Sequence, residues 1–467
     1  MFSLMIVVFV LGYTAIALEH NIKVNKTASA LFLGVAMWTM LMLDASGILG
    51  LDIGGRFSEF LSNHPDLLSL PKWEQYVKYI ADNQVVEFLG EIAEILFFLM
   101  GAMTIVEIVD QHGGFKIITN RIKTRNKVKL LWVISFITFF MSAALDNLTT
   151  SIVMVALLRK LIHEKHERWL FAGVVVLAAN AGGAWSPIGD VTTIMLWIKG
   201  NVTTASIVTK LFIPSLVSMI VPLIILSFKL KGEMPVKDKH HPEKVHQPSP
   251  ATRRERHIIF ILGVGALLFT PVFKLISHLP PFMGMLLGLS VLWIFTELMY
   301  HRKRNLDDKE KRTVARVIKN VDVPTILFFL GILMAVDALQ TAGHLTLLSE
   351  WLDKTFTSPY PPNILIGVLS SIVDNVPLVA GAMGMHEALP LAQATGELAN
   401  YAIDGSFWNL LAYCAGTGGS ILIIGSAAGV AVMGLEKIDF MWYAKRISLL
   451  ALVGYFAGIA TYFLMFG

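Results

Sequence analysis

Two Asp-Asn pairs, each set in the middle of a long apolar segment, constrain this chain more than any other feature. They lie at Asp146-Asn147 within SAALDNLTTS and at Asp374-Asn375 within SSIVDNVPLV. Moving an aspartate into the hydrocarbon core of a bilayer costs about 2.5 to 3.5 kcal/mol on insertion scales, so such an acid usually marks a functional site. The pairs therefore predict an ion site at membrane depth.

The composition is typical of a polytopic membrane protein. Of the 467 residues, 55% are hydrophobic and only 15% are charged, and the pattern contains no P-loop. We therefore expect membrane lipid as a partner, and neither a nucleotide, a nucleic acid nor a cofactor. A span needs about 20 apolar residues. Runs of that length, or nearly so, fall at about 3–18, 28–50, 88–110, 169–199, 206–228, 257–277, 281–300, 323–341, 406–435 and 447–466.

Loop charge predicts the course of the two segments that carry Asp-Asn, 130–158 and 363–386, each of which is either one long span or a re-entrant hairpin. Most of the 38 Lys and Arg residues lie in a few loops, which the positive-inside rule assigns to the cytoplasm. Such loops flank 130–158 on both sides, so we expect a hairpin that opens to the cytoplasm. The loops around 363–386 carry little positive charge, so this hairpin opens outside. Both termini are then external.

Three ordered sequence matches indicate that the chain is an inverted repeat. Residues 95–114 match 326–344 with one inserted residue, SAALDN matches SSIVDN, and Gly182-Gly183 with Gly189 matches Gly418-Gly419 with Gly425. The predicted fold is all-α, with a first repeat at 1–228, a cytoplasmic linker at 229–256 and a second repeat at 257–467. Each repeat has five spans, one of them broken (169–199 or 406–435), and one hairpin, which is an architecture of secondary transporters.

The predicted site is rich in oxygen ligands and poor in positive charge. Unwound backbone at membrane depth is tolerated only where it is buried in protein or lines a wet cavity. The breaks and hairpin tips hold three acids, Asp146, Asp190 and Asp374, and no Lys or Arg, which favours a small hard cation over an anion. In the second break, Ser426 stands near the place of Asp190. The other candidate ligands are Ser142, Asn147, Thr149, Thr150, Thr192, Thr193, Ser370 and Asn375.

Two alternatives accompany this site. The aspartates are also good caps for helix N-termini, which is a purely structural role. If they do bind ions, a carboxylate that takes either a proton or a metal ion, and holds the two poorly together, is sufficient for exchange. Glu107 and Asp337 are expected near opposite membrane faces, as structural or gating residues rather than ligands.

At the DNLTT tip, the NAGGAWSPIGDVTT break and the DNVP tip, the chain resembles the NhaD-type sodium/proton antiporters of the ion transporter superfamily. The resemblance implies a homodimer in the bacterial inner membrane. It also implies an elevator-type fold, in which a scaffold domain forms the interface and a moving domain contains both hairpins, exchanging external protons for cytoplasmic Na⁺ or Li⁺. The family's polar residues map onto Asp146, Asn147, Asn180, Asp190, Thr192, Thr193, Asp374 and Asn375, with an accessory acid on the third span at Glu91 or Glu94.

The alternative within this superfamily is an anion, dicarboxylate or arsenite carrier. Carboxylate carriers have Ser-Asn-Thr at positions resembling these tips, whereas this chain has Asp-Asn at both. A passive ion channel, from a different class, fits an inverted pair of repeats around buried acids less well. Glu91 and Glu94 have an alternative too, as solvated or interfacial residues near the outer end of their span.

Overall fold

The part of the chain that the structure describes is predominantly helical. The computed structural model describes residues 1–467 apart from 18, 116, 118–123, 125, 163, 234–250, 304–310, 357, 359, 373–374, 391–393, 395 and 467. Within these limits the only β-structure is two isolated bridges, Asn126 with Glu233 and Leu389 with Ala402. The prediction of an all-α fold is confirmed.

Within the described residues, eight helical stretches are long and apolar enough to cross a membrane. They are α3 (Lys26–Leu43), the stretch Lys72–Gln111, α9 (Lys127–Leu145), α13 (Thr204–Lys229), α14 (Arg253–Ser277), α15 (Pro281–Arg302), α17 (Val323–Thr341) and α24 (Ser448–Phe466). The stretch Lys72–Gln111 joins α6 (Lys72–Val77), a π-helical segment (Lys78–Gln84) and α7 (Val85–Gln111). The chain is therefore a multi-pass membrane protein.

Some predicted spans differ from the observed helices. The run 3–18 forms α1 (Phe2–Ala17), which is 16 residues long and shorter than a full span. The run 28–50 is interrupted at Asp44, whose backbone N–H caps α3 and which is followed by the short helix α4 (Ala45–Leu49). The remaining short helices are α2 (Glu19–Ile22), α5 (Arg56–Asn63), α16 (Val314–Val317), α18 (His344–Thr355) and α23 (Phe440–Arg446), with 3₁₀ turns at Ile53–Gly55, Pro65–Ser69, Ile318–Asn320 and Gly396–Tyr401.

The four segments predicted to be broken are each two helices. The hairpin segments give α9 with α10 (Asn147–Leu161) and α19 (Tyr360–Leu369) with α20 (Asn375–Met385). The broken spans give α11 (Lys165–Ala184) with α12 (Val191–Ile198), and α21 (Ser406–Gly418) with α22 (Ala427–Glu436). In the first hairpin, α9 ends because Asp146 adopts φ 125° and ψ 163°, a conformation that essentially only glycine takes without strain.

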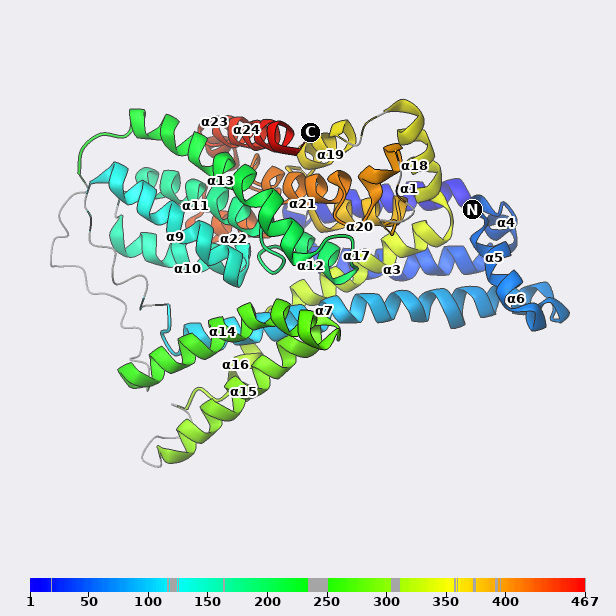
Figure 1. Ribbon diagram of the computed structural model, residues 1–467, viewed down its shortest axis with the longest axis horizontal. Helices are drawn as coiled ribbons and strands as arrows, with labels where there is room; N and C mark the ends of the chain where they lie inside the picture. The colour runs from blue at the N-terminus through cyan, green and yellow to red at the C-terminus, as the bar shows by residue number, and fades with distance from the viewer. Residues whose placement is uncertain are drawn as a thin grey trace.

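These broken helices pack against one another. In Figure 1, α9, α10, α11 and α13 form one group, while α14, α15 and part of α7 lie together along one side of the molecule. Among the described residues, the most extensive helix–helix contacts join α3 with α17, α13 with α24, α11 with α9, α14 with α15 and α19 with α21. Consequently each hairpin packs on a broken span through its first helix.

Glycines allow these two helix pairs to approach closely. A Cβ atom added at Gly182 in α11 would lie 2.2 Å from the carbonyl oxygen of Phe139 in α9. One added at Gly418 in α21 would lie 2.0 Å from the carbonyl oxygen of Gly367 in α19. Because both obstacles are backbone atoms, neither can move without shifting a helix.

We expect Gly418→Ala to destabilise the protein, because the added methyl group must push α19 away from α21. Overpacking of this kind costs about 1 to 3 kcal/mol. Gly434→Ala in α22 is the matched control, since a Cβ atom there meets nothing within 4 Å and alanine favours a helix over glycine. Thermal unfolding of the purified protein should show a lower midpoint for Gly418→Ala only. Equal midpoints for the two variants would contradict the close packing.

Candidate functional site

Asp190 is the centre of a buried polar cluster. It lies at the break between α11 and α12, where its side chain caps the N-terminus of α12, and it is 1% exposed. Its Oδ1 accepts hydrogen bonds from the backbone N–H and the hydroxyl of Thr192, both at 3.0 Å. The hydroxyl of Thr193 donates to the Asp190 carbonyl oxygen at 2.8 Å. Asp190 therefore makes the N-cap contact that the structural alternative expects.

Both hairpin tips reach the same carboxylate. Asn147 Nδ2, from the first hairpin, donates to Asp190 Oδ2 at 2.7 Å, and Asn375 Nδ2, from the second, donates to Oδ1 at 3.3 Å. All three side chains are buried. The structure thus brings together residues that the sequence places in three separate segments.

Asn180 extends this cluster to the other broken span. Its Oδ1 accepts from Asn147 Nδ2 at 3.1 Å, and its Nδ2 donates to Ser426 Oγ at 3.0 Å and Ser420 Oγ at 3.3 Å. Ser426 caps α22 as Asp190 caps α12. Ser420 was not among the predicted site residues, and only its place next to Gly418-Gly419 would have suggested it.

Helix ends set the electrostatic character of the cluster. Three helices begin at the cluster. The helices α10 and α20 begin at Asn147 and Asn375, and α12 begins at Val191, the residue after Asp190. The N-terminus of a helix carries a partial positive charge, which stabilises a nearby carboxylate. The negative charge of Asp190 therefore has compensation from the helix that it caps, and from the two hairpin amides.

Asp146 has a different local role from Asp190. Its Oδ1 accepts from the backbone N–H of Thr149 at 2.7 Å, and its Oδ2 accepts from the Thr149 hydroxyl at 2.8 Å. This is the N-cap of α10, as the alternative to ion binding predicted. The carboxylates of Asp146 and Asp190 are still near enough to interact electrostatically. Asp374, the matching residue of the second hairpin, lies outside the described residues.

The two predicted serines join the hairpins to the broken spans. Ser142 Oγ donates to the carbonyl oxygen of Ala179 in α11 at 2.6 Å, and Ser370 Oγ donates to that of Ala415 in α21 at 2.8 Å. Both serines are fully buried. Their hydroxyl groups hold helix pairs together, and the described hydrogen bonds of these hydroxyls go to the broken spans rather than to Asp190.

Two further hydroxyls lie one helical turn beyond Asn147 on α10. Thr150 Oγ1 and Ser151 Oγ are buried and have no hydrogen-bond partner among the described residues. Thr150 was predicted as an oxygen ligand, whereas Ser151 was not. Unpaired buried hydroxyls are costly, so they often mark a place where a ligand or an ion completes the structure.

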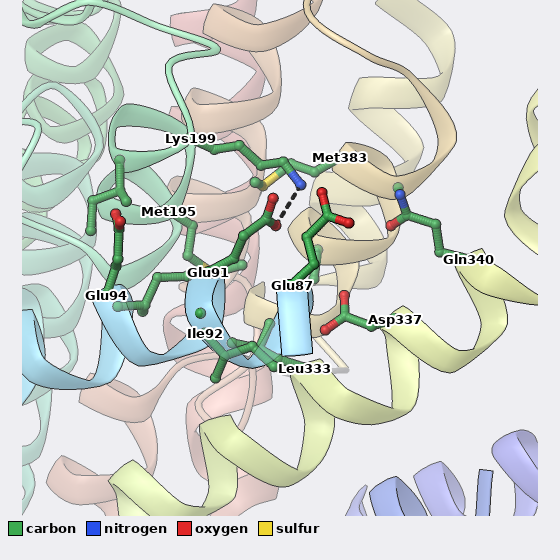
Figure 2. A pocket seen from close by; sticks show the side chains of 15 residues that line it. Glu87, Glu91, Ile92, Glu94, Met195, Lys199, Leu333, Asp337, Gln340 and Met383 are labelled. Carbon is green, nitrogen blue, oxygen red and sulfur yellow. Dashed lines mark hydrogen bonds and ion pairs between the residues drawn. The ribbon is translucent and has the colours of Figure 1, made fainter. Parts of the chain in front are cut away.

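The predicted accessory acids lie in a separate cavity of about 330 Å³. Figure 2 shows Glu91 and Glu94 of α7 in this cavity, with the Lys199 ammonium group donating to Glu91 Oε2 at 2.9 Å. The other labelled lining residues are Glu87, Ile92, Met195, Leu333, Asp337, Gln340 and Met383. Neither acid hydrogen-bonds to the Asp190 cluster in the described contacts. No group of three or more His, Cys, Asp or Glu side chains among the described residues forms a chelating set.

Comparison with known proteins identifies relatives of this chain. A family model for citrate transporters matches residues 13–403. Sodium/proton antiporter 1 of Arabidopsis thaliana is 43% identical over 98% of this chain and 71% of its own length. Sodium/proton antiporter 2 of the same plant is 40% identical over 98% of both chains. The Na⁺/H⁺ antiporter NhaD of Vibrio cholerae is 30% identical over 98% of this chain and 91% of its own length.

The three relatives match over 98% of the chain, which includes both hairpins and both broken spans, whereas the family model ends before the second broken span. They confirm the resemblance inferred from the tips and breaks. The chain belongs to the family of NhaD-type sodium/proton antiporters, whose members are membrane transporters and not enzymes.

Proposed function

We propose that this protein exchanges cytoplasmic Na⁺ or Li⁺ for external protons, and that both kinds of ion bind at Asp190. The observation that carries the proposal is the buried Asp190 carboxylate, which receives an amide group from each hairpin tip. A carboxylate in this position holds a proton or a cation but binds the two poorly together. Such competition couples the two ions without a separate proton pathway.

The direction of the helix ends favours a cation over an anionic substrate. In transporters of anions, helix N-termini point at the negative group of the substrate. Here α10, α12 and α20 begin around the protein's own carboxylate, Asp190, and the described hydrogen bonds to it come from amide and hydroxyl groups. The sequences of both hairpin tips and both breaks contain no Lys or Arg, so they offer a citrate, dicarboxylate or arsenite anion no guanidinium or ammonium group.

Na⁺ binding requires a change in the two amides. Asn147 and Asn375 now present their nitrogen atoms to Asp190. Rotation of either amide about its terminal torsion presents the carbonyl oxygen instead, which is a suitable ligand for a hard cation. In the proposed Na⁺-bound state, these oxygens join Asp190, the hydroxyls of Thr192 and Thr193, and the unpaired Thr150 hydroxyl. Asp146 and Asp374 contribute charge, with Thr149 holding Asp146 in place.

Matched contacts support the two inverted repeats. Ser142 and Ser370 donate to carbonyl oxygens that lie three residues before Gly182 and Gly418, respectively. Added Cβ atoms at Gly189 and Gly425 would meet the carbonyl oxygens of the same two serines, at 3.0 and 2.5 Å. Contacts that recur at matched positions are expected if 1–228 and 257–467 share one architecture, joined by the linker 229–256.

The packing of the third spans supports the same symmetry. A Cβ atom at Gly101 of α7 would meet Met285 of α15, and one at the matching Gly331 of α17 would meet Ala30 of α3. Each third span thus packs on the second span of the other repeat. We propose that α3, α7, α14, α15 and α17 belong to a scaffold that forms a homodimer, and that the hairpins and broken spans move against it as an elevator. The many exposed apolar side chains of α14 and α15 are available for lipid or for a second copy.

The proposed orientation has both termini outside. Figure 1 shows the beginnings of α9 and α14 at one end of the molecule and α4, α5 and α6 at the other, which matches the separation of basic and acidic loops. We propose the bacterial inner membrane as the location. The relatives come from a plant and from bacteria. The loop charges support the orientation of the chain in its membrane and do not bear on which membrane that is.

Cysteine labelling tests this orientation. In a Cys414→Ala background, we expect Lys165→Cys, beside the first hairpin, to react with an impermeant thiol reagent only from the cytoplasmic side. Glu387→Cys, beside the second hairpin, should react only from outside. Both side chains are exposed, and Cys414 is buried, so labelling reports the side of the membrane. Reaction of both positions from one side would exclude oppositely oriented hairpins.

Asp190→Asn should abolish exchange while leaving the fold intact. Asparagine caps a helix as well as aspartate does, so the substitution removes the charge and keeps the cap of α12. In everted vesicles, addition of Na⁺ or Li⁺ should dissipate the pH gradient with the unmodified protein but not with this variant. Citrate and arsenite should have no effect on either protein.

Glu107→Gln provides the matched control, because Glu107 bonds to Gln111 within α7 and not to the Asp190 cluster. This variant should retain most of the Na⁺-dependent exchange. Unchanged exchange in a well-folded Asp190→Asn variant would mean that the residue is only a helix cap. Gradient dissipation by citrate instead of Na⁺ would support the anion carrier.

A further inference from the structure

The acidic cavity between α7 and α17 contains a buried oxygen atom without a partner. Asp337 Oδ2 accepts no hydrogen bond among the described residues, although it is buried. Figure 2 shows the Asp337 carboxylate pointing into the same cavity as Glu87 and Glu91. An unsatisfied buried carboxylate oxygen is costly, so the cavity is incomplete as it stands.

The charges that line this cavity are strongly unbalanced. Its walls carry four carboxylates, Glu87, Glu91, Glu94 and Asp337, and one ammonium group, that of Lys199. Lys199 is paired with Glu91 at 2.9 Å. A second lysine, Lys274, lies near Glu94 but donates to the carbonyl oxygen of Trp197 at 2.7 Å. A concave surface lined by one sign of charge concentrates ions of the opposite sign.

We propose that this cavity is a second cation-binding site, separate from Asp190, in which the Lys199 ammonium is a tethered competitor for Na⁺ or Li⁺. Asp337 and Glu91 are the principal acids of the site. The four carboxylates do not form a close chelating set, so the bound cation keeps part of its hydration shell. Because Lys199 is itself a compact, strongly hydrated charge, it and a hydrated metal ion suit the same position.

The cavity adjoins a larger one, which offers ions a way in. A neighbouring cavity of about 580 Å³ shares Glu87, Glu91, Lys199, Gln340 and Met383 with it. Polar residues from α5 and from the end of the second hairpin line the rest of that space, including Arg56, Asn63 and Glu387. In the proposed orientation this entrance faces outside, where Na⁺ leaves and protons arrive.

One short helix connects the second site to the first. The helix α12 has eight residues, or about 12 Å at about 1.5 Å per residue; Asp190 caps its beginning and Lys199 its end. Lys199 reaches from the broken span to α7, which we assign to the scaffold. A cation that displaces Lys199 from Glu91 therefore releases a contact that any movement of α12 along α7 must break.

Equilibrium binding of radioactive Na⁺ to the purified full-length protein tests the second site. The Asp190→Asn variant should retain saturable Na⁺ binding, and Asp190→Asn with Asp337→Asn should lose it. Asp190→Asn with Lys199→Ala should bind the remaining Na⁺ more tightly, by up to about fivefold, the strength of a partly exposed ion pair. Lys354→Ala is the control, because its ion pair with Glu350 at 3.7 Å lies elsewhere, on α18, and should not affect binding.

The outcomes separate this site from the proposed function. Absence of saturable binding in Asp190→Asn, with binding in the unmodified protein, would overturn the second site and leave exchange at Asp190 intact. Weaker or unchanged Na⁺ binding on loss of Lys199 would show that the lysine is a structural partner and would also overturn it. The Lys199→Ala measurement decides the case if Asp337→Asn fails to fold, which thermal unfolding will reveal.

Discussion

The structure depends on keeping one buried carboxylate, Asp190, supplied with hydrogen-bond donors. A buried charge without partners costs several kcal/mol in free energy, so its surroundings must be built to compensate it. Asp190 receives two bonds from Thr192 and one from each hairpin-tip asparagine. Each donor comes from an interrupted helix. The interruptions, which would be unfavourable in lipid, are tolerated because they meet one another in the interior.

The close packing of the helices follows from the same requirement. For two hairpin tips to reach one carboxylate, α9 must lie against α11 and α19 against α21 at backbone contact. Gly182 and Gly418 permit this approach, and the hydroxyls of Ser142 and Ser370 fasten it. In the elevator that we propose, this closely packed unit would move as one body with the bound ion.

The sequence predicted the all-helical, multi-pass character and the four interrupted segments, because these signals are local. The Asp-Asn and Gly-Gly steps lie within apolar runs, and the structure breaks the helices at or just after each of them. The role of Asp146 was not decidable in this way. An aspartate followed three residues later by a threonine fits both a helix cap and an ion ligand, and only the fold turns its carboxylate toward Thr149. The apolar run 28–50 was predicted as one span from its length alone. The helix α3 ends earlier because Asp44, within that run, is its C-cap.

Contacts between distant segments were also beyond prediction from one sequence. Glu91 and Glu94 were expected as accessory acids, but nothing in the sequence brings Lys199 or Asp337 to them. That cavity arises because α7, α12 and α17 meet in the folded chain. Likewise, Ser420 and Ser151 are recognised as candidate site residues only once the folded structure shows their positions relative to Asn180 and Asn147.

In the proposed mechanism, a proton and Na⁺ compete for Asp190. The most direct measurement is the half-saturating Na⁺ concentration for exchange, determined from alkaline to mildly acidic pH on one preparation. If the ions share the carboxylate, this concentration rises on acidification. At pH values below the pKa of the site, the rise approaches about tenfold per pH unit for each proton displaced, and at pH values above the pKa the concentration levels off. A constant half-saturating concentration, with exchange intact over the whole range, would contradict a shared site.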